Sequence, residues 1–210
     1  MSETYVDFGR TSTGPGNGQS GADLAQVLIN QVAKLKDVST ICDLGSGNGY
    51  LTGRLANLGY EVIGVDASSK GIELARRSYP KAKFFNELVD TNLGTRIALT
   101  DVDLVISSDV IEHLYRPSDL LEAAVSVLRP DGQILIGTPY HGYLKNVAIS
   151  LAGKMDSHFT ALHDGGHIKF FSVRTLSQLI ERHGFTDLSY SFFGRAPLLW
   201  KNMICHARRS

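Results

Sequence analysis

The chain has 210 residues and carries 21 basic and 21 acidic residues, so its formal net charge is zero. The basic residues are scattered along the chain, which argues against a surface for nucleic acid. Hydrophobic residues make up 43% of the composition, which is ordinary for a globular protein with a sizeable core. A chain of this length predicts a single domain over residues 1–210.

The two cysteines, Cys42 and Cys205, each lie inside an apolar run, so we expect reduced core thiols rather than a disulfide or a metal framework. The first ten residues lack the basic and apolar regions of an export signal. No apolar stretch reaches the roughly 18 residues that a membrane span requires. These features predict a cytoplasmic protein that is neither exported nor membrane-spanning.

In chain order, a segment rich in Gly, Ser and Thr comes first, and we expect residues 1–21 to be flexible. A helix over 23–35 follows from apolar residues at helical spacing. Alternating strands and helices come next: strands at 39–44, 61–65, 82–86, 102–107 and 132–137, and helices at 49–58, 69–79 and 117–128. The strands are apolar throughout, which is typical of a parallel sheet buried on both faces.

The pattern changes after residue 137. Residues 140–167 contain no strand candidate, and we expect an insertion or lid there. A helix at 173–183 precedes two apolar runs, 186–193 and 198–207, that predict an antiparallel pair. The whole order predicts an α/β fold with a doubly wound, Rossmann-like sheet of seven strands, mostly parallel, with an antiparallel last strand and helices on both faces.

The segment ICDLGSGNG at 41–49 predicts a nucleotide-like ligand, because its glycines let a ligand lie against the backbone where a strand gives way to a helix. Dinucleotide dehydrogenases place G-x-G-x-x-G here, but Tyr50 stands where the third glycine belongs. Asp43, two residues before the first glycine, suits an ammonium group better than a pyrophosphate. Asp66 follows 23 positions later, where a carboxylate would meet ribose hydroxyls.

With GVDAS at 64–68, DLVISSDVIEHL at 103–114 and LRPDGQILIGTPY at 128–140, this loop resembles class I S-adenosylmethionine-dependent methyltransferases. The triplets EHL and TPY, with GHIKFFS at 166–172, are similar to the ubiquinone-biosynthesis type of O-methyltransferase and related bacterial small-molecule methyltransferases. The resemblance implies S-adenosyl-L-methionine as cofactor, with Ser107 and Ser108 beneath the sulfonium. The cofactor-binding residues that it implies are Asp43, Gly45, Ser46, Gly47, Asn48, Asp66, Ala67, Leu88, Val89 and Ser108.

The methyl acceptor is expected beyond the fourth and fifth strands, since open parallel sheets bind ligands at the carboxyl ends of their strands. Asp109, Glu112 and His113 are spaced i, i+3 and i+4, which would place them on one face of a helical turn. They are candidates to hold a divalent metal ion, to act on the acceptor as base or orienting group, or to cap the next helix. Ser107 and Ser108 stand where DNA amino-methyltransferases have a proline-rich motif, which argues against base amines.

Four of the seven histidines fall within residues 141–171, namely His141, His158, His163 and His167. His167 is the strongest candidate among them, because glycines before it let the backbone approach and an apolar run after it anchors it. We therefore predict His113, His167 and Glu112 as catalytic residues. The apolar segment 146–159 predicts a lid, or else an interfacial helix in contact with a membrane.

Methyl transfer to an oxygen atom of a small molecule is the leading hypothesis from the sequence. Transfer to a small amine needs less help from a base and is the nearest alternative. A cofactor-binding module without catalysis and a nicotinamide dehydrogenase are the others. No oligomeric state follows from the sequence.

Overall fold

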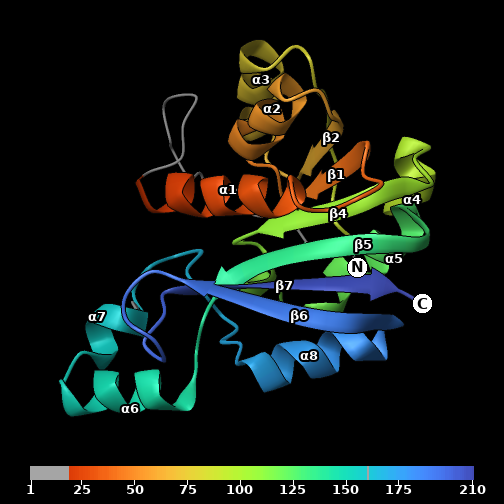
Figure 1. Ribbon diagram of the computed structural model, residues 1–210. Coiled ribbons are helices and arrows are strands. Elements are labelled where there is room, and N and C mark those ends of the chain that lie inside the picture. Colours follow the sequence, from red (N-terminus) through yellow and green to blue (C-terminus); the bar gives the residue numbers. More distant parts are fainter. Residues whose placement is uncertain (1–18, 160) are drawn as a thin grey trace.

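The computed structural model describes residues 19–159 and 161–210, which contain a seven-stranded sheet of order β3-β2-β1-β4-β5-β7-β6 (Figure 1). The strands are β1 (Thr40–Leu44), β2 (Glu61–Asp66), β3 (Lys83–Asn86), β4 (Val102–Ser108), β5 (Leu128–Pro139), β6 (Phe185–Phe193) and β7 (Asn202–Arg209). Neighbours among β1 to β5 pair in parallel, whereas β7 is antiparallel to both β5 and β6. The predicted fold class is confirmed.

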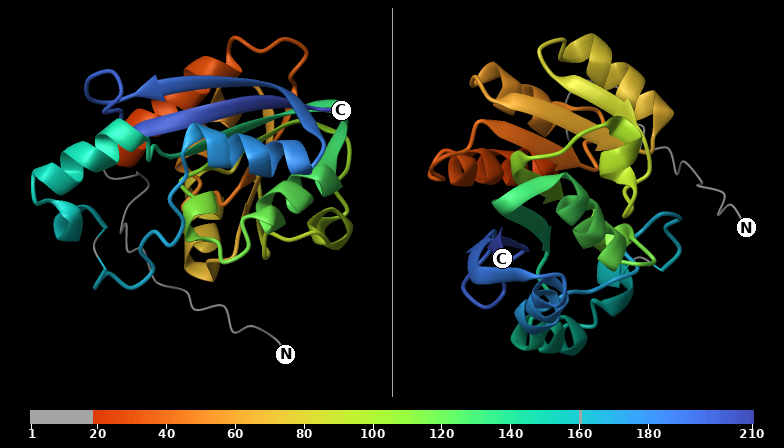
Figure 2. Two further views of the ribbon diagram at one scale, coloured as in Figure 1. Left: turned by 90° about the horizontal axis from the view of Figure 1, so that it is seen from below. Right: turned by 90° about the vertical axis from the view of Figure 1, so that its right-hand side faces the viewer.

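Helices cover both faces of the sheet (Figure 2). One face carries α1 (Gln19–Val32), α2 (Tyr50–Asn57) and α3 (Ser69–Ser78), and the other carries α4 (Leu93–Ile97), α5 (Ser118–Val127) and α8 (Val173–Arg182). Two further helices, α6 (Tyr143–Leu151) and α7 (Met155–Phe159), lie beyond the carboxyl end of β5 (Figure 1). They occupy half of the predicted insertion, residues 140–167.

Successive side chains along a strand point to opposite faces of the sheet and pack into two separate hydrophobic cores. Ile41 packs with α1 and α2 on one face, whereas its neighbour Cys42 packs with α5 and α8 on the other. Leu104 and Val105 divide in the same way. Cys42 and Cys205 are both free and fully buried, as predicted.

Several element boundaries differ from the predicted ones. The first helix begins at Gln19 rather than at residue 23, and most of the segment predicted to be flexible, 1–21, lies outside the described residues. The last strand begins at Asn202 rather than at 198, because Leu198, with φ of +67°, belongs to the β6–β7 turn. The short helix α4 was not predicted. In the described part of the chain, no helix is long and apolar enough to cross a bilayer.

Candidate functional site

The glycine loop after β1 folds back on the end of β2. The N–H groups of Gly45 and Ser46 both donate to the carbonyl of Val65, at 2.8 and 3.0 Å. A Cβ at Gly45 would lie 2.2 Å from Val110 Cγ2, whereas one at Gly47 would meet no heavy atom within 4 Å. Gly45 therefore permits close packing, and Gly47 borders open space.

Asp66 fixes this loop from the end of β2. Its Oδ2 accepts a hydrogen bond from the N–H of Gly47 at 2.8 Å, and its Oδ1 accepts one from Ser68 at 2.8 Å. The carboxylate is only partly buried. It thus lies next to Gly47 and is partly open to solvent, as a ribose contact would require.

Asp43 is a buried carboxyl group inside β1, with 2% of its surface exposed. The Thr52 hydroxyl donates to its Oδ2 at 2.5 Å. Burial raises the pKa of Asp43 to about 7; the Thr52 hydrogen bond opposes this rise, and the charge of Asp66 adds to it. Beside it on the loop, Ser46 is buried and its Oγ has no hydrogen-bond partner among the described residues. Both groups would gain from a cationic or hydrogen-bonding ligand.

The segment after β3 is held by a residue that the sequence analysis missed. Arg96 of α4 donates to Glu87 at 2.9 Å, to Asp90 at 2.7 Å and to the carbonyl of Leu88 at 2.6 Å. Leu88 is exposed, whereas Val89 packs against the core. Arg96 therefore fixes the path of Leu88 and Val89, two of the residues that the resemblance implies for cofactor binding.

Asn86, at the end of β3, was also missed. Its Nδ2 donates to the carbonyls of Asp66 and Ala67, at 3.0 and 2.9 Å. On the other side of β1, Ser107 Oγ donates to the carbonyl of Leu44 at 2.8 Å, and its neighbour Ser108 is partly exposed at the end of β4. Asn86 thus ties the end of β2 to β3, and Ser107 ties the end of β1 to β4.

The helical turn predicted for Asp109, Glu112 and His113 does not form. Asp109 has φ of +54°, in the left-handed region, and the helical geometry begins only with a 3₁₀ turn at Ile111–His113. Asp109 therefore does not share a helical face with the other two. The prediction that Glu112 or His113 caps the next helix is also wrong, because α5 begins after Pro117 without a side-chain cap.

His167 joins Glu112 and His113 in place of Asp109. These three side chains offer one ligand atom each, all within 4.8 Å of one another. Glu112 is 1% exposed; its Oε2 accepts a hydrogen bond from Thr138 at 3.0 Å, and its Oε1 lies 3.9 Å from His167 Nε2. The rings of His113 and His167 meet edge to face, with centroids 4.9 Å apart.

Main-chain bonds hold the segment around His167 over this cluster. The N–H groups of Ile168 and Lys169 both donate to the carbonyl of Glu112, at 2.9 and 3.0 Å. His113 Nδ1 lies 3.1 Å from the carbonyl of Gly166. Because a carbonyl only accepts, Nδ1 carries the proton there, and in the neutral ring the lone pair is on Nε2.

His141 and His158 form a second group with two phenylalanines, and His163 belongs to neither group. His141 is 5.5 Å from His158 and 5.0 Å from Phe170, measured between ring centroids. Phe159 packs against Phe170 at 4.9 Å. Burial, together with the charges of Lys145 and His158, lowers the pKa of His141 to about 4. At neutral pH the His141 ring is therefore uncharged.

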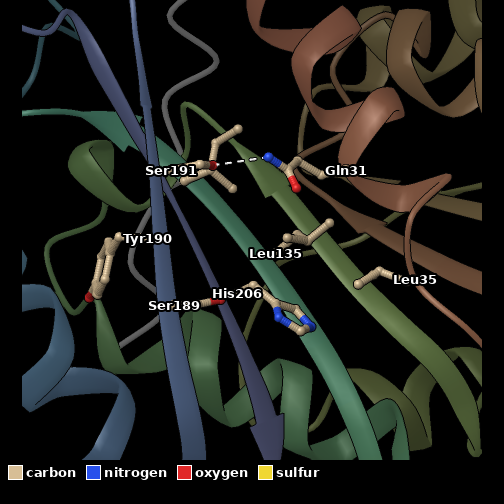
Figure 3. Close-up of a pocket in the computed structure, with 8 residues that line it drawn as sticks. Gln31, Leu35, Leu135, Ser189, Tyr190, Ser191 and His206 are labelled. Carbon is tan, nitrogen blue, oxygen red and sulfur yellow. Dashed lines mark hydrogen bonds between the residues drawn. The ribbon is translucent and has the colours of Figure 1, made fainter.

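A separate hollow of about 170 Å³ lies between α1 and the strands β5, β7 and β6 (Figure 3). Gln31 reaches from α1 to Ser191 of β6, where its Nε2 donates to the hydroxyl at 3.2 Å. His206 of β7 also lines the hollow, and its Nε2 donates to Gln133 at 2.8 Å. None of the residues predicted for cofactor or acceptor lines this hollow.

Comparisons of the sequence and the structure with known proteins point to methyltransferases. A family model described as "Methyltransferase domain" matches residues 19–190. The chain is 31% identical over 167 residues to the biotin biosynthesis bifunctional protein BioHC of Cellvibrio japonicus, covering 79% of this chain and 31% of that protein. It is 29% identical over 175 residues to the mitochondrial ubiquinone biosynthesis O-methyltransferase of Bos taurus, covering 77% and 45%.

The matches to the curated relatives named here thus span less than half of their length. Among solved structures, a SAM-dependent methyltransferase from Archaeoglobus fulgidus aligns with a TM-score of 0.66 at 18% identity, over 89% of this chain and 93% of that one. The magnesium protoporphyrin IX methyltransferase ChlM of Synechocystis PCC 6803, with bound SAH, aligns at 0.61 and 20% identity, over 91% and 82%. At these identities the likeness concerns the fold.

Proposed function

Because the chain belongs to the methyltransferase domain family and has the fold of class I S-adenosylmethionine-dependent methyltransferases, we propose that it transfers the methyl group of S-adenosylmethionine to a hydroxyl group of a small molecule. The observation that carries the proposal is the cluster of Glu112, His113 and His167 beside the carboxyl end of β4. The family also excludes the dehydrogenase considered from the sequence.

The glycine loop fits the cofactor. Gly47 leaves open space for a ligand against the backbone, Asp43 is a buried carboxyl suited to the ammonium of the methionine moiety, and Asp66 is partly exposed for the ribose. Ser46 offers a buried hydroxyl without a hydrogen-bond partner among the described residues. When bound, S-adenosylmethionine would supply an electrophilic methyl group on a positively charged sulfur atom.

His113 is the residue that we assign to the acceptor hydroxyl. Its Nδ1–H bond to Gly166 leaves the lone pair on Nε2, which is the atom that would take the hydroxyl proton. Glu112 lies 3.9 Å from His167 and would stabilise positive charge on the imidazole pair. A positioned base of this kind contributes about 10²- to 10⁴-fold to a rate.

A divalent metal ion is a second way to activate the same hydroxyl. One carboxylate and two imidazoles within 4.8 Å of one another match the donors that such ions accept. The ion would be held by Glu112, His113 and His167, rather than by the predicted set that includes Asp109. Its chemistry would be to lower the pKa of the acceptor hydroxyl.

We further propose that α6 and α7 form a lid over the acceptor, within residues 140–167. A hollow of about 590 Å³ opens beside α7, lined by Asp156, Ala161, Leu162 and His163. The two buried thiols, Cys42 and Cys205, support a reducing compartment such as the cytoplasm.

A panel of catechols and small amines, assayed for S-adenosylhomocysteine release with and without chelator, tests these proposals. We expect turnover of a catechol, a loss of rate of about 10²-fold or more in His113→Ala, and an unchanged rate in the control His183→Ala at the end of α8. Loss of turnover in chelator would assign the metal; full activity in chelator would assign the imidazole base. Turnover of amines alone, at a normal rate in His113→Ala, would contradict the oxygen acceptor.

A further inference from the structure

Positive charge is concentrated in two segments around the proposed acceptor site, residues 140–171 and the β6–β7 connection at 194–201. Together they hold five lysines and arginines but only two carboxylates, although the whole chain has 21 of each sign. The cations are Lys145, Lys154, Lys169, Arg195 and Lys201, and the carboxylates are Asp156 and Asp164. In the described part of the chain, neither aspartate forms an ion pair.

Lys145 is the most deeply buried of these cations, at 3% exposure near the start of α6. Its Nζ donates to the carbonyl of Tyr140 at 2.6 Å and approaches that of Lys201 at 3.5 Å. Burial, together with the positive charges of Arg195 and Lys201, lowers the pKa of Lys145 to about 8, so the amine is still mostly charged at pH 7. A buried ammonium group that is paired only with carbonyls is costly, which suggests a role beyond stability.

Arg195 brings a second charge to the same place. Its positive charge lowers the pKa of both Lys145 and His158, so the three groups lie within electrostatic range of one another. Arg195 has φ of +67° and is exposed, and its side chain makes no hydrogen bond or ion pair with the residues described. Its guanidinium group is therefore available to a ligand.

This positive region adjoins the cluster around Glu112. The His141 N–H donates to the carbonyl of Phe171 at 2.9 Å, in the same segment whose residues 168 and 169 donate to Glu112. His141 is 7% exposed, and the charges of Lys145 and His167 both lower its pKa, so both groups lie within electrostatic range of its ring. A ligand that reaches Glu112 would therefore extend toward the cations.

We propose that this region is an anion-binding subsite, and that the acceptor carries a carboxylate or phosphate in addition to the hydroxyl group that is methylated. Arg195 would contact the anion, and the buried Lys145 would make the electrostatic potential at that place more positive. Phe159 and Phe170 would contact the apolar part of the acceptor. The role in acceptor recognition rests on the proposed function, but the subsite can be measured without turnover.

Calorimetry on the protein loaded with S-adenosylhomocysteine tests the subsite with two matched probes, 3,4-dihydroxybenzoate and the neutral catechol. We expect the carboxylate to bind about tenfold more tightly, and high salt to remove this preference. Arg195→Gln should weaken the carboxylate about fivefold, the upper end for an exposed charge pair, and leave catechol unchanged. The control Arg182→Gln removes an exposed cation of α8 and should change neither.

Equal affinity for the two probes, binding of neither probe, or an unchanged preference in Arg195→Gln would overturn the subsite. Tight, salt-sensitive binding of the carboxylate without any methyl transfer would uphold the subsite and contradict the proposed function instead. Inorganic phosphate and acetate as competitors distinguish the sources of the anion. Stronger displacement by phosphate assigns a phosphate group, and stronger displacement by acetate assigns a carboxylate.

Discussion

Replacing Gly47 with alanine tests whether the open space beside the glycine loop holds the cofactor. Gly47 has φ of +54°, where an alanine costs about 1–2 kcal/mol of folding free energy. A Cβ there meets no heavy atom within 4 Å, so no further loss of stability is expected. If the cofactor fills that space, the methyl group forces it from the backbone, at about 1 kcal/mol for a lost hydrogen bond and about 1 kcal/mol or more for crowding. S-adenosylhomocysteine should then bind about thirtyfold more weakly.

Gly153, in the link between α6 and α7, offers a matched control. Its φ is +62°, and a Cβ there also meets nothing within 4 Å. Urea unfolding should show similar losses for Gly47→Ala and Gly153→Ala, whereas calorimetry should show weaker cofactor binding only for Gly47→Ala. If both variants bind S-adenosylhomocysteine as the unmodified protein does, the loop is only a turn and the cofactor lies elsewhere.

Four further predictions concern the cofactor and acceptor sites. Because burial raises the pKa of Asp43 to about 7, affinity for S-adenosylhomocysteine should fall about tenfold per pH unit below 7, and calorimetry on Asp43→Asn should show no such dependence. Since this folded pKa exceeds the unfolded value of about 3.9, the contribution of Asp43 to stability is complete below about pH 4 and is lost as pH rises through 7; a flat difference in Tm between Asp43→Asn and the unmodified protein would contradict this. Arg96→Met should free residues 87–90, giving faster hydrogen exchange there and cofactor binding about fivefold weaker; unchanged exchange would show that Arg96 does not hold them. Exchange over 143–159 should slow when cofactor and acceptor are both bound, whereas slowing by liposomes alone would favour membrane contact over a lid.

The parallel strands were predictable because each is a short apolar run buried on both faces, as Ile41 and Cys42 illustrate with their packing on opposite cores. The helix α4 was not, since its five residues, Leu93–Ile97, are too few to show a helical period. Strand β7 begins later than predicted because Leu198 lies in a turn. Its left-handed backbone conformation could not be predicted from the local sequence.

The glycine loop was predictable for a local reason, since its conformation needs glycines at fixed positions and a carboxylate at the next strand end. The polar groups that hold it are different. Asn86 bonds to the carbonyls of Asp66 and Ala67 across two strands, and Arg96 reaches back to Leu88. Both contacts depend on how strands and helices pack, so their only trace in the sequence is a polar residue at an element's end.

The acceptor cluster shows how a local spacing rule can select the wrong third residue. The i, i+3, i+4 spacing of Asp109, Glu112 and His113 places them on one face only if the helix is continuous. Asp109 has a left-handed backbone conformation, so it is not part of such a helix. His167 takes its place although it lies 55 residues from Glu112, because Ile168 and Lys169 bond to the Glu112 carbonyl. Those bonds use main-chain atoms, so almost any sequence could form them, and only glycines before the histidine indicated that the segment could approach. A substitution of His167 therefore removes the imidazole but leaves the main-chain bonds that hold the segment in place.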